Sequence, residues 1–345
     1  MGIIGRHSFE LCSRPRIISS ASYVGDKEGK GPLRECFDKI CRDDTLGLDS
    51  WEQAESRMFE SAVRVALTKI KRQSDDLSCL LGGDLLNQII SSGFAAREIR
   101  APFIGLYGAC STISEGLMLG GMLVDGGFAE LAACAASSHF SAAERQFRYP
   151  LEMGVQAVPS SQRTVTGAGS IIIQAAGEFR PGAGNVFEHV ALTGGTIGSV
   201  EDFGITDANN MGAAMAPAAF KTIKTHLSDY SRRVEDYDRI ITGDLGIFGS
   251  DMLYELLRGE GIEIADRHED CGKLMFSQEQ NVNCGASGCG CAATVMSSWF
   301  LPKIESGEIR RVLFLATGAL MSPVSSLQGE SIPSIAHAVV IEHID

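Results

Sequence analysis

The sequence contains no long uninterrupted hydrophobic run and no cluster of basic side chains. Charged residues interrupt the longest apolar runs well before the ~20 residues that a membrane-spanning helix needs. Lysine and arginine number 30 against 43 aspartates and glutamates, which gives a net charge of -13 without a basic stripe to neutralise phosphates. These absences argue against a transmembrane protein and against nucleic acid as a partner.

A disulfide framework and a metal-binding motif are also missing. Ten cysteines are scattered along the chain without the spacing of a disulfide-bonded scaffold. Three of them, Cys284, Cys289 and Cys291, lie close together in the sequence, but no fourth ligand follows at the spacing of a zinc site. No aspartate-rich calcium loop is visible. We therefore expect no metal site and no cofactor.

The first residues, Met-Gly-Ile-Ile-Gly-Arg, lack the pattern of a secretory signal peptide. Together with the scattered cysteines, this predicts a soluble protein that is made in a reducing cytoplasm. Any contact with a membrane is then expected to be peripheral.

What the chain does have is a large apolar content in alternating strand and helix patterns. Its 345 residues are 44% hydrophobic, enough for a sizeable core in two domains or one duplicated unit. Apolar spacing and turn residues predict helices at 51–71, 92–99 and 113–124, and strands at 76–83, 103–107, 131–137 and 166–174. The chain is therefore expected to be an α/β protein, with 141–149 as a structured loop that interrupts the alternation.

The second half of the chain repeats the order of the first. Residues 237–245 resemble 81–85, residues 311–317 resemble 131–137, and residues 336–340 resemble 168–172. A period this long indicates two fused βαβαβ-type halves rather than an array of short repeats. The turn-rich connector at 177–184 places the expected boundary between domains at 1–180 and 181–345.

Cys110 occupies a distinctive position, on a Gly-Ala-Cys-Ser turn between a strand and a helix of small residues. The free N–H groups and the dipole of a helix N-terminus favour an anion there, such as a thiolate, an oxyanion or a bound carboxylate. A buried and inert cysteine is the alternative, and the spacing alone leaves both open.

The Cys110 turn and the matching Gly-Ala-Ser-Gly segment at 285–288 resemble the thiolase and ketoacyl-synthase superfamily. More narrowly, ungapped blocks of the sequence resemble the stage V sporulation protein AD family, namely 83–88, 107–112, 124–129, 137–139, 143–150, 204–207, 211–218 and 316–320. The resemblance covers nearly the whole chain. It implies a thiolase-like fold, in which the two halves form a five-layer αβαβα sandwich, and a homodimer.

The resemblance also implies a function. Members of this family bind dipicolinic acid (pyridine-2,6-dicarboxylic acid) and take part in its uptake into the developing spore and its release on germination. The implied partners are dipicolinic acid itself and other proteins of the SpoVA operon at the spore inner membrane, where this chain would lie peripherally. Calcium could accompany the ligand.

Condensing activity is not expected from the second-half loops. Where condensing enzymes of the superfamily carry a histidine or asparagine, this chain has Asp244, and where thiolases have a histidine it has Val282. The histidines His268, His337 and His343 fall on neither motif. A catalytically degenerate binding protein is the favoured interpretation. The alternatives are an acyl-CoA-dependent acyltransferase or thioesterase with Cys110 as nucleophile, and a scaffold for membrane partners.

A planar dicarboxylate needs donors or cations for each carboxylate and a flat apolar slot for its ring. The backbone N–H groups of Cys110 and Ser111, with the Ser111 hydroxyl, are expected to bind one carboxylate. The candidates for the other, or for supporting networks, are His139, Arg145, Arg148, Asn87, Asn283, Gly285, Asp84 and His337. Simpler interpretations stay open for some of these: a capped turn for Asp84, a core histidine for His337, and a solvated or dimer-contact loop for the two arginines.

Overall fold

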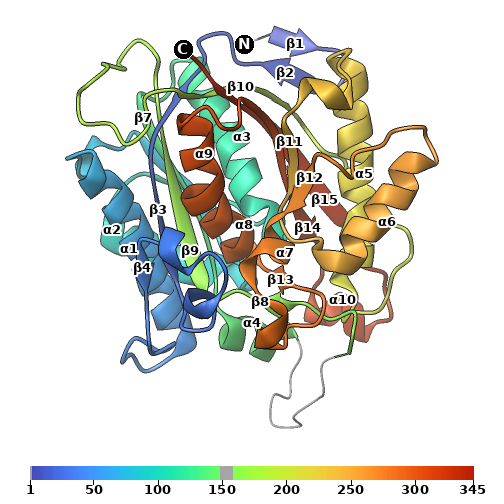
Figure 1. Ribbon diagram of the computed structural model, residues 1–345. Coiled ribbons are helices and arrows are strands. Elements are labelled where there is room, and N and C mark those ends of the chain that lie inside the picture. The colour runs from blue at the N-terminus through green and yellow to red at the C-terminus, as the bar shows by residue number, and fades with distance from the viewer. Residues whose placement is uncertain (1, 148–157) are drawn as a thin grey trace.

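In the computed structural model, which describes residues 2–147 and 158–345, one mixed sheet runs through the whole molecule (Figure 1). The first half contributes β3 (Arg16–Val24), β9 (Gly167–Gln174), β7 (Leu131–Ser138), β5 (Cys79–Gly83) and β6 (Phe103–Gly105), in that spatial order. The second half contributes β10 (Val190–Thr196), β15 (Ser334–His343), β14 (Arg311–Ala319), β11 (Arg239–Thr242) and β12 (His268–Asp270) in the matching order. The predicted duplication is therefore visible strand by strand.

The two halves share the same pattern of strand directions and meet along β3 and β10. In each half, the inner three strands are antiparallel and the outer two are parallel to the third. Arg16 of β3 faces Ala191 of β10 at the junction. The expected boundary at residue 180 falls on the segment between β9 and β10. Three short strands extend the two central strands: β2 (Ser8–Glu10) pairs with β10 and with β1 (Gly2–Ile4), and β4 (Lys39–Ile40) pairs with β3.

Helices pack on both sides of each half and between the halves, which makes five layers (Figure 1). The outer layers are α1 (Trp51–Lys69) with α2 (Ile90–Ile99), and α5 (Met211–Asp229) with α6 (Gly246–Arg258). The central layer holds α3 (Thr112–Asp125) and α8 (Cys289–Val295), the latter continuing through a π-helical turn into α9 (Leu301–Glu305). Three separate apolar clusters fill the spaces between these layers. The predicted αβαβα sandwich is confirmed.

The central helices are built from small residues because they lie between two sheets. On α3, Gly116, Gly120 and Gly121 are buried, and a Cβ atom at Gly120 would lie only 2.9 Å from Sγ of Cys134 on β7. A larger side chain would push the helix away from the strand. The same helix contacts β14 and β15 of the other half, so its small residues bring the two halves together.

One sequence prediction is wrong in this region. Residues 141–149 were expected to form a loop, whereas α4 spans Phe140–Phe147 and only the last two of these positions lie outside the described residues. Ala142 and Ala143 face inward, and Ala143 N–H donates to the His139 carbonyl at 3.0 Å, which is the regular helical pattern. A helix of this length carries too few turns for its apolar spacing to stand out in the sequence.

Two short helices and two short strands complete the fold near the carboxyl ends of the parallel strands. They are α7 (Cys271–Met275), α10 (Pro323–Leu327), and the two-stranded sheet of β8 (Arg163–Thr164) and β13 (Ala286–Ser287). No helix among the described residues is both long and apolar enough to cross a lipid bilayer.

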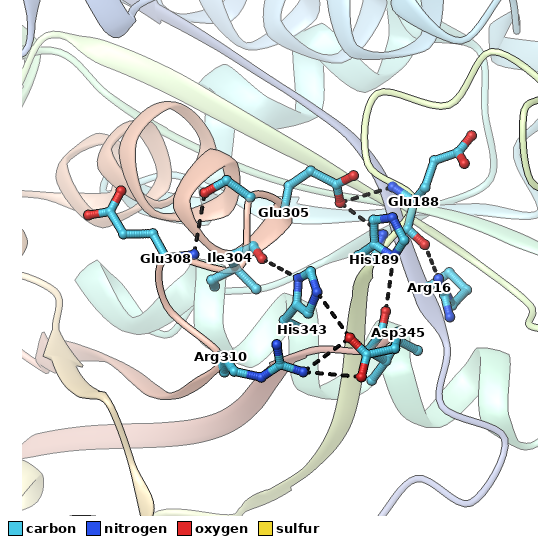
Figure 2. A network of polar contacts seen from close by, with 11 residues as sticks. Arg16, Glu188, His189, Ile304, Glu305, Glu308, Arg310, His343 and Asp345 are labelled. Atoms are coloured by element: carbon cyan, nitrogen blue, oxygen red, sulfur yellow. Dashed lines mark hydrogen bonds and ion pairs between the residues drawn. The ribbon is translucent and has the colours of Figure 1, made fainter.

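A polar network ties the opposite end of the sheet together (Figure 2). Glu305 at the end of α9 accepts hydrogen bonds from the backbone N–H groups of Glu188 and His189, and His189 stacks on His343 at 5.2 Å between ring centroids. His343 ends β15, whereas Ser334 at the start of the same strand pairs with Ala319 of β14. This network is therefore structural and lies a full strand length from the Ala319 end.

Candidate functional site

A cavity of about 260 Å³ lies beside Cys110, where the carboxyl ends of strands from both halves meet. Its walls come from the segment after β5, the Cys110 turn, α4, β8, β13, the start of α5 and the segment after β14. The lining residues are Leu85, Tyr107, Ala109, Cys110, Ala143, Glu144, Phe147, Thr164, Met211, Met215, Ser287, Ala319, Leu320, Met321 and Ser322. Most of this surface is apolar, and four of the lining residues carry hydroxyl groups, namely Tyr107, Thr164, Ser287 and Ser322.

The Cys110 turn is held by close backbone packing. Ala109 adopts a positive φ of 50°, and a short 3₁₀ turn, η5 (Ala109–Ser111), leads into α3. A Cβ atom at Gly318 of β14 would lie 2.4 Å from the Gly108 carbonyl oxygen, so only glycine fits there. The second half of the chain therefore fixes the position of the cysteine.

The Ser111 donors are already used inside this turn. Both the Ser111 backbone N–H (3.1 Å) and the Ser111 hydroxyl (2.6 Å) donate to the Gly108 carbonyl. Ser111 is fully buried and does not line the cavity. The expectation that these two donors bind a carboxylate therefore does not match their observed partners.

Asp244 lies directly behind the cavity wall and is the immediate partner of Cys110. Its carboxylate accepts hydrogen bonds from Thr317 Oγ1 (2.9 Å), Gly288 N–H (2.9 Å) and Ser287 Oγ (3.1 Å), and it is hydrogen-bonded to the Cys110 thiol. Burial raises the pKa of Asp244 to about 6. The hydrogen bonds lower this pKa and so offset part of the effect of burial.

The same environment keeps the cysteine protonated. Burial, followed by the charge of Asp244, raises the pKa of the Cys110 thiol well above its ordinary value. A thiolate is the reactive form of cysteine, so this thiol is poorly suited to attack an acyl group. The thiol is hydrogen-bonded to the Asp244 carboxylate, and its sulfur accepts from the Gly288 backbone N–H.

The second-half histidines are occupied elsewhere. His268 lies between the hydroxyls of Thr242 and Tyr254, each at 2.8 Å, and burial lowers its pKa to about 3. His337 accepts from the Gly198 N–H at 3.2 Å, and burial lowers its pKa to about 4. Among the described residues that line the cavity there is no histidine. His337 thus behaves as a core histidine.

Of the predicted ligand-binding residues that the structure describes, only Cys110 lines the cavity. Asp84 caps the turn after β5, accepting from the N–H groups of Leu86 and Ser92 and from the Ser92 hydroxyl. Asn87 and Arg145 line a separate groove on the surface. Arg145 pairs with Glu52 and lies over the Trp51 ring, so its charge is directed away from Cys110.

The remaining candidates have structural partners. His139 is buried and hydrogen-bonded to the Asp44 carbonyl at 2.8 Å, and burial lowers its pKa. Asn283 donates to the Val158 carbonyl at 2.9 Å. Gly285 has a positive φ of 108°, and its carbonyl accepts from the Arg163 N–H, which aligns β8 with β13. Arg148 lies outside the described residues.

Most of the cavity wall is formed by residues whose type carries no chemical signal in the sequence. Met211, Met215, Leu320 and Met321 are ordinary apolar residues, and they come from the start of α5 and the segment after β14. Met211 and Met215 belong to one of the blocks that carry the family resemblance, which is the one feature that could have pointed to them. In the described part of the chain, no group of three or more histidine, cysteine or acidic side chains is arranged to hold a metal ion.

Known proteins resemble this chain over nearly its whole length. A family model described as Stage V sporulation protein AD (SpoVAD) matches residues 5–342. Stage V sporulation protein AD of Bacillus subtilis (strain 168) is 43% identical over 343 residues, which cover 99% of this chain and 98% of that protein.

Solved structures extend the comparison to the fold. Cerulenin-bound OleA of Xanthomonas campestris superposes with a TM-score of 0.58 at 14% identity, covering 98% of both chains. The 3-oxoacyl-(acyl carrier protein) synthase III of Pseudomonas aeruginosa PAO1 gives a TM-score of 0.55 at 12% identity, covering 96% of this chain and 99% of that one. Likeness at such low identity concerns the fold alone, and it confirms the predicted thiolase-like fold.

Proposed function

The chain belongs to the stage V sporulation protein AD family, and from this we propose that its Cys110 cavity binds dipicolinic acid. Membership of the family places its function in sporulation. The proposal goes further: the protein takes part in the uptake of dipicolinic acid into the developing spore and in its release on germination.

The observation that carries the proposal is the cavity itself. It is a partly open, largely apolar space of about 260 Å³, and a largely apolar cavity with a few polar groups is the usual character of a site for a small organic ligand. Three methionines, Met211, Met215 and Met321, contribute to its walls. Methionine side chains make favourable contacts with aromatic rings and adapt to their shape, so they suit a flat pyridine ring.

Binding without catalysis is supported by the pair of Cys110 and Asp244. An acyltransferase or thioesterase would need a thiolate and groups that stabilise a developing oxyanion. Here the thiol is buried, protonated and hydrogen-bonded to a carboxylate, and the histidines of the second half have other partners. The alternative of an acyl-CoA-dependent enzyme is therefore not favoured.

The proposal also includes the oligomeric state, the partners and the location of the protein. It acts as a homodimer, without a resident cofactor, and docks peripherally on other SpoVA operon proteins at the spore inner membrane. Calcium either accompanies the ligand or is absent, and the titration below distinguishes these two cases because it is run with calcium and with a chelator. The family resemblance supports these statements.

Calorimetric titration of the purified protein with dipicolinic acid tests the proposal. We expect saturable binding of one ligand per chain, at least tenfold weaker in Ala319→Trp, because the added indole occupies the cavity. Ala183→Trp, on an exposed loop away from the cavity, is the matched control and should bind like the native protein.

Two results would count against the proposal. An absence of heat at millimolar ligand, with calcium and with a chelator, would remove dipicolinic acid as the ligand. Equal affinities of Ala319→Trp and the native protein would move binding away from the Cys110 cavity.

A further inference from the structure

Exposed apolar side chains lie on two segments that lead away from the wall of the Cys110 cavity. Segment 197–210 connects β10 to α5, whose first residue Met211 lines the cavity, and segment 323–333 follows the lining residues 319–322. The exposed apolar side chains of these segments are Ile197, Val200, Phe203, Val324 and Leu327, which are between 47% and 89% exposed. Apolar side chains that gather on a protein surface mark a place where another molecule binds.

Hydrogen bonds join the two segments into one surface, here called the rim. The backbones of Glu201 and Ser334 exchange hydrogen bonds of 2.8 and 2.9 Å, and the Ile332 N–H donates to the Ile205 carbonyl at 2.7 Å. Figure 1 shows α10, which carries Leu327, at the same end of the molecule as α4, β8 and β13 of the cavity wall. The rim is therefore continuous and lies beside the cavity.

The charged side chains of the rim are all acidic. They are Glu201, Asp202, Asp207 and Glu330, and neither segment contains a lysine, an arginine or a histidine. Where these carboxylates accept hydrogen bonds, the donors are uncharged hydroxyl, amide and backbone N–H groups. Within the described part of the chain none of the four forms an ion pair, whereas Glu255 on the neighbouring α6 pairs with Arg258. The rim thus combines exposed apolar groups with uncompensated negative charge.

From this combination we propose that the rim is the docking site for a basic amphipathic segment of a partner protein. The inference rests on the docking on membrane partners in the proposed function, and it names the surface and the chemistry of the partner. Lysine or arginine side chains of such a segment pair with the four rim carboxylates, and its apolar side chains cover Val324 and Leu327.

Two other occupants fit the rim less well. A second copy seated on it about a two-fold axis would bring the carboxylates of one rim toward the same carboxylates of the other, and like charges repel. An anionic lipid surface would be repelled for the same reason, because attraction to such a surface uses lysine and arginine. The charge of the rim therefore favours a basic protein segment.

Docking on the rim involves the same segments that shape the cavity. Met321 and Ser322 line the cavity directly before α10 begins at Pro323. In the other segment, the Asn210 side chain accepts from the Ala213 N–H at 3.3 Å and so caps the helix that presents Met211 to the cavity. A partner on the rim therefore sits next to the proposed ligand site and not on a remote face.

Binding of a designed peptide tests the inference. The probe is a fluorescent synthetic peptide of leucine and lysine, about 18 residues long, with its leucines on one face of a helix. A second peptide carries glutamate in place of lysine. In fluorescence anisotropy without dipicolinic acid, we expect saturable binding of the lysine peptide to the native protein, weakened by added salt, and no binding of the glutamate peptide.

A matched pair of double variants assigns the binding to the rim. Leu327→Ser with Glu330→Lys removes the most exposed apolar side chain of the rim and reverses one of its charges, so we expect the affinity to fall at least about tenfold. Phe128→Ser with Glu130→Lys changes the net charge equally at the opposite end of the sheet, just before β7, and should bind like the native protein. All four side chains are exposed, so both proteins should fold.

Three results would overturn the inference. Absence of peptide binding would exclude a basic amphipathic partner, and equal weakening in both double variants would mean that net charge alone attracts the peptide. Sedimentation of the rim variant as a monomer beside a dimeric native protein would assign the rim to a second copy. Leu327 and Glu330 do not line the cavity, so a failure of the native protein to bind dipicolinic acid would count against the proposed ligand and not against the rim.

Discussion

The residue type and position of Cys110 favour a reactive thiolate, whereas the surroundings of its side chain favour the protonated thiol. A cysteine at the N-terminus of a helix usually has a depressed pKa, because the helix dipole favours the thiolate. Here burial and the Asp244 carboxylate raise the pKa of the thiol instead. The sequence does not show which of these opposing effects on the thiol pKa prevails, because Asp244 lies 134 positions further along the chain.

Alkylation tests the state of this thiol. In native protein at pH 8, we expect iodoacetamide to modify the exposed Cys12 within minutes and to leave Cys110 unmodified, as followed by mass spectrometry of the peptides. Asp244→Asn removes the adjacent charge and should speed modification of Cys110 about tenfold, the effect of one unit of pKa.

Cys134 is the internal control for that comparison. It is also fully buried, and no contact with Asp244 contributes to its raised pKa, so its modification should be equally slow in both proteins. Rapid labelling of Cys110 in the native protein would restore the acyltransferase as the better interpretation.

Among the elements, those with several turns or a long apolar run were predictable from the sequence. The helix at 51–71 corresponds to α1, the helix at 113–124 to α3, and the strand at 131–137 to β7. Burial on one face or on all sides requires apolar residues at regular positions in these elements, and that spacing is visible in the sequence. The short α4 was missed because its helical pattern spans only two turns.

The site was less predictable than the fold. The sequence located Cys110, but the candidates around it were chosen for their chemistry, and charged groups such as Arg145 found partners outside the cavity. The wall is formed instead by apolar side chains such as Met211 and Met321. These residues meet only because α5 and the segment after β14 pack beside η5, a consequence of the duplicated fold and not of any local pattern.

Gly318 shows how tightly β14 holds the Cys110 turn, and its substitution is informative. Gly318→Ala would place a methyl group 2.4 Å from the Gly108 carbonyl oxygen, so the strand or the turn must move. We expect a loss of about 1–3 kcal/mol in the free energy of unfolding, measured in urea, with weaker binding of dipicolinic acid.

Gly93 offers the matched control on α2. A Cβ atom there would meet no other atom within 4 Å, and the position is inside a helix. Gly93→Ala should therefore stabilise the protein by about 0.5–1 kcal/mol. Equal effects of the two substitutions would mean that the contact between β14 and η5 is not tight in solution.

For the whole molecule, the duplication leaves a sheet with two free ends among the described residues. β6 ends the first half and β12 ends the second, and each has a strand neighbour on one side. Beside β6 the surface is apolar: Ile104 is 41% exposed and Phe94 of α2 is 46% exposed. Unpaired strand edges flanked by apolar side chains invite pairing with another chain.

We expect the proposed homodimer to form by pairing of β6 with β6 of a second copy across a two-fold axis. We expect native protein to sediment as a dimer at micromolar concentration and Ile104→Lys to sediment as a monomer, because a charged side chain on an edge strand opposes pairing. Ile247→Lys, at a similarly exposed site (50%) at the start of α6, should remain dimeric.

Assembly and ligand binding are then connected through the short segment that follows β6. Tyr107 lines the cavity and lies two residues beyond the end of the strand, and its hydroxyl donates to Asn87 Oδ1 at 3.3 Å. A second copy paired along β6 would hold this segment in place, so the monomeric Ile104→Lys should also bind dipicolinic acid more weakly than Ile247→Lys. A dimer that survives Ile104→Lys would place the interface elsewhere, and unchanged affinity in a monomer would separate assembly from the site.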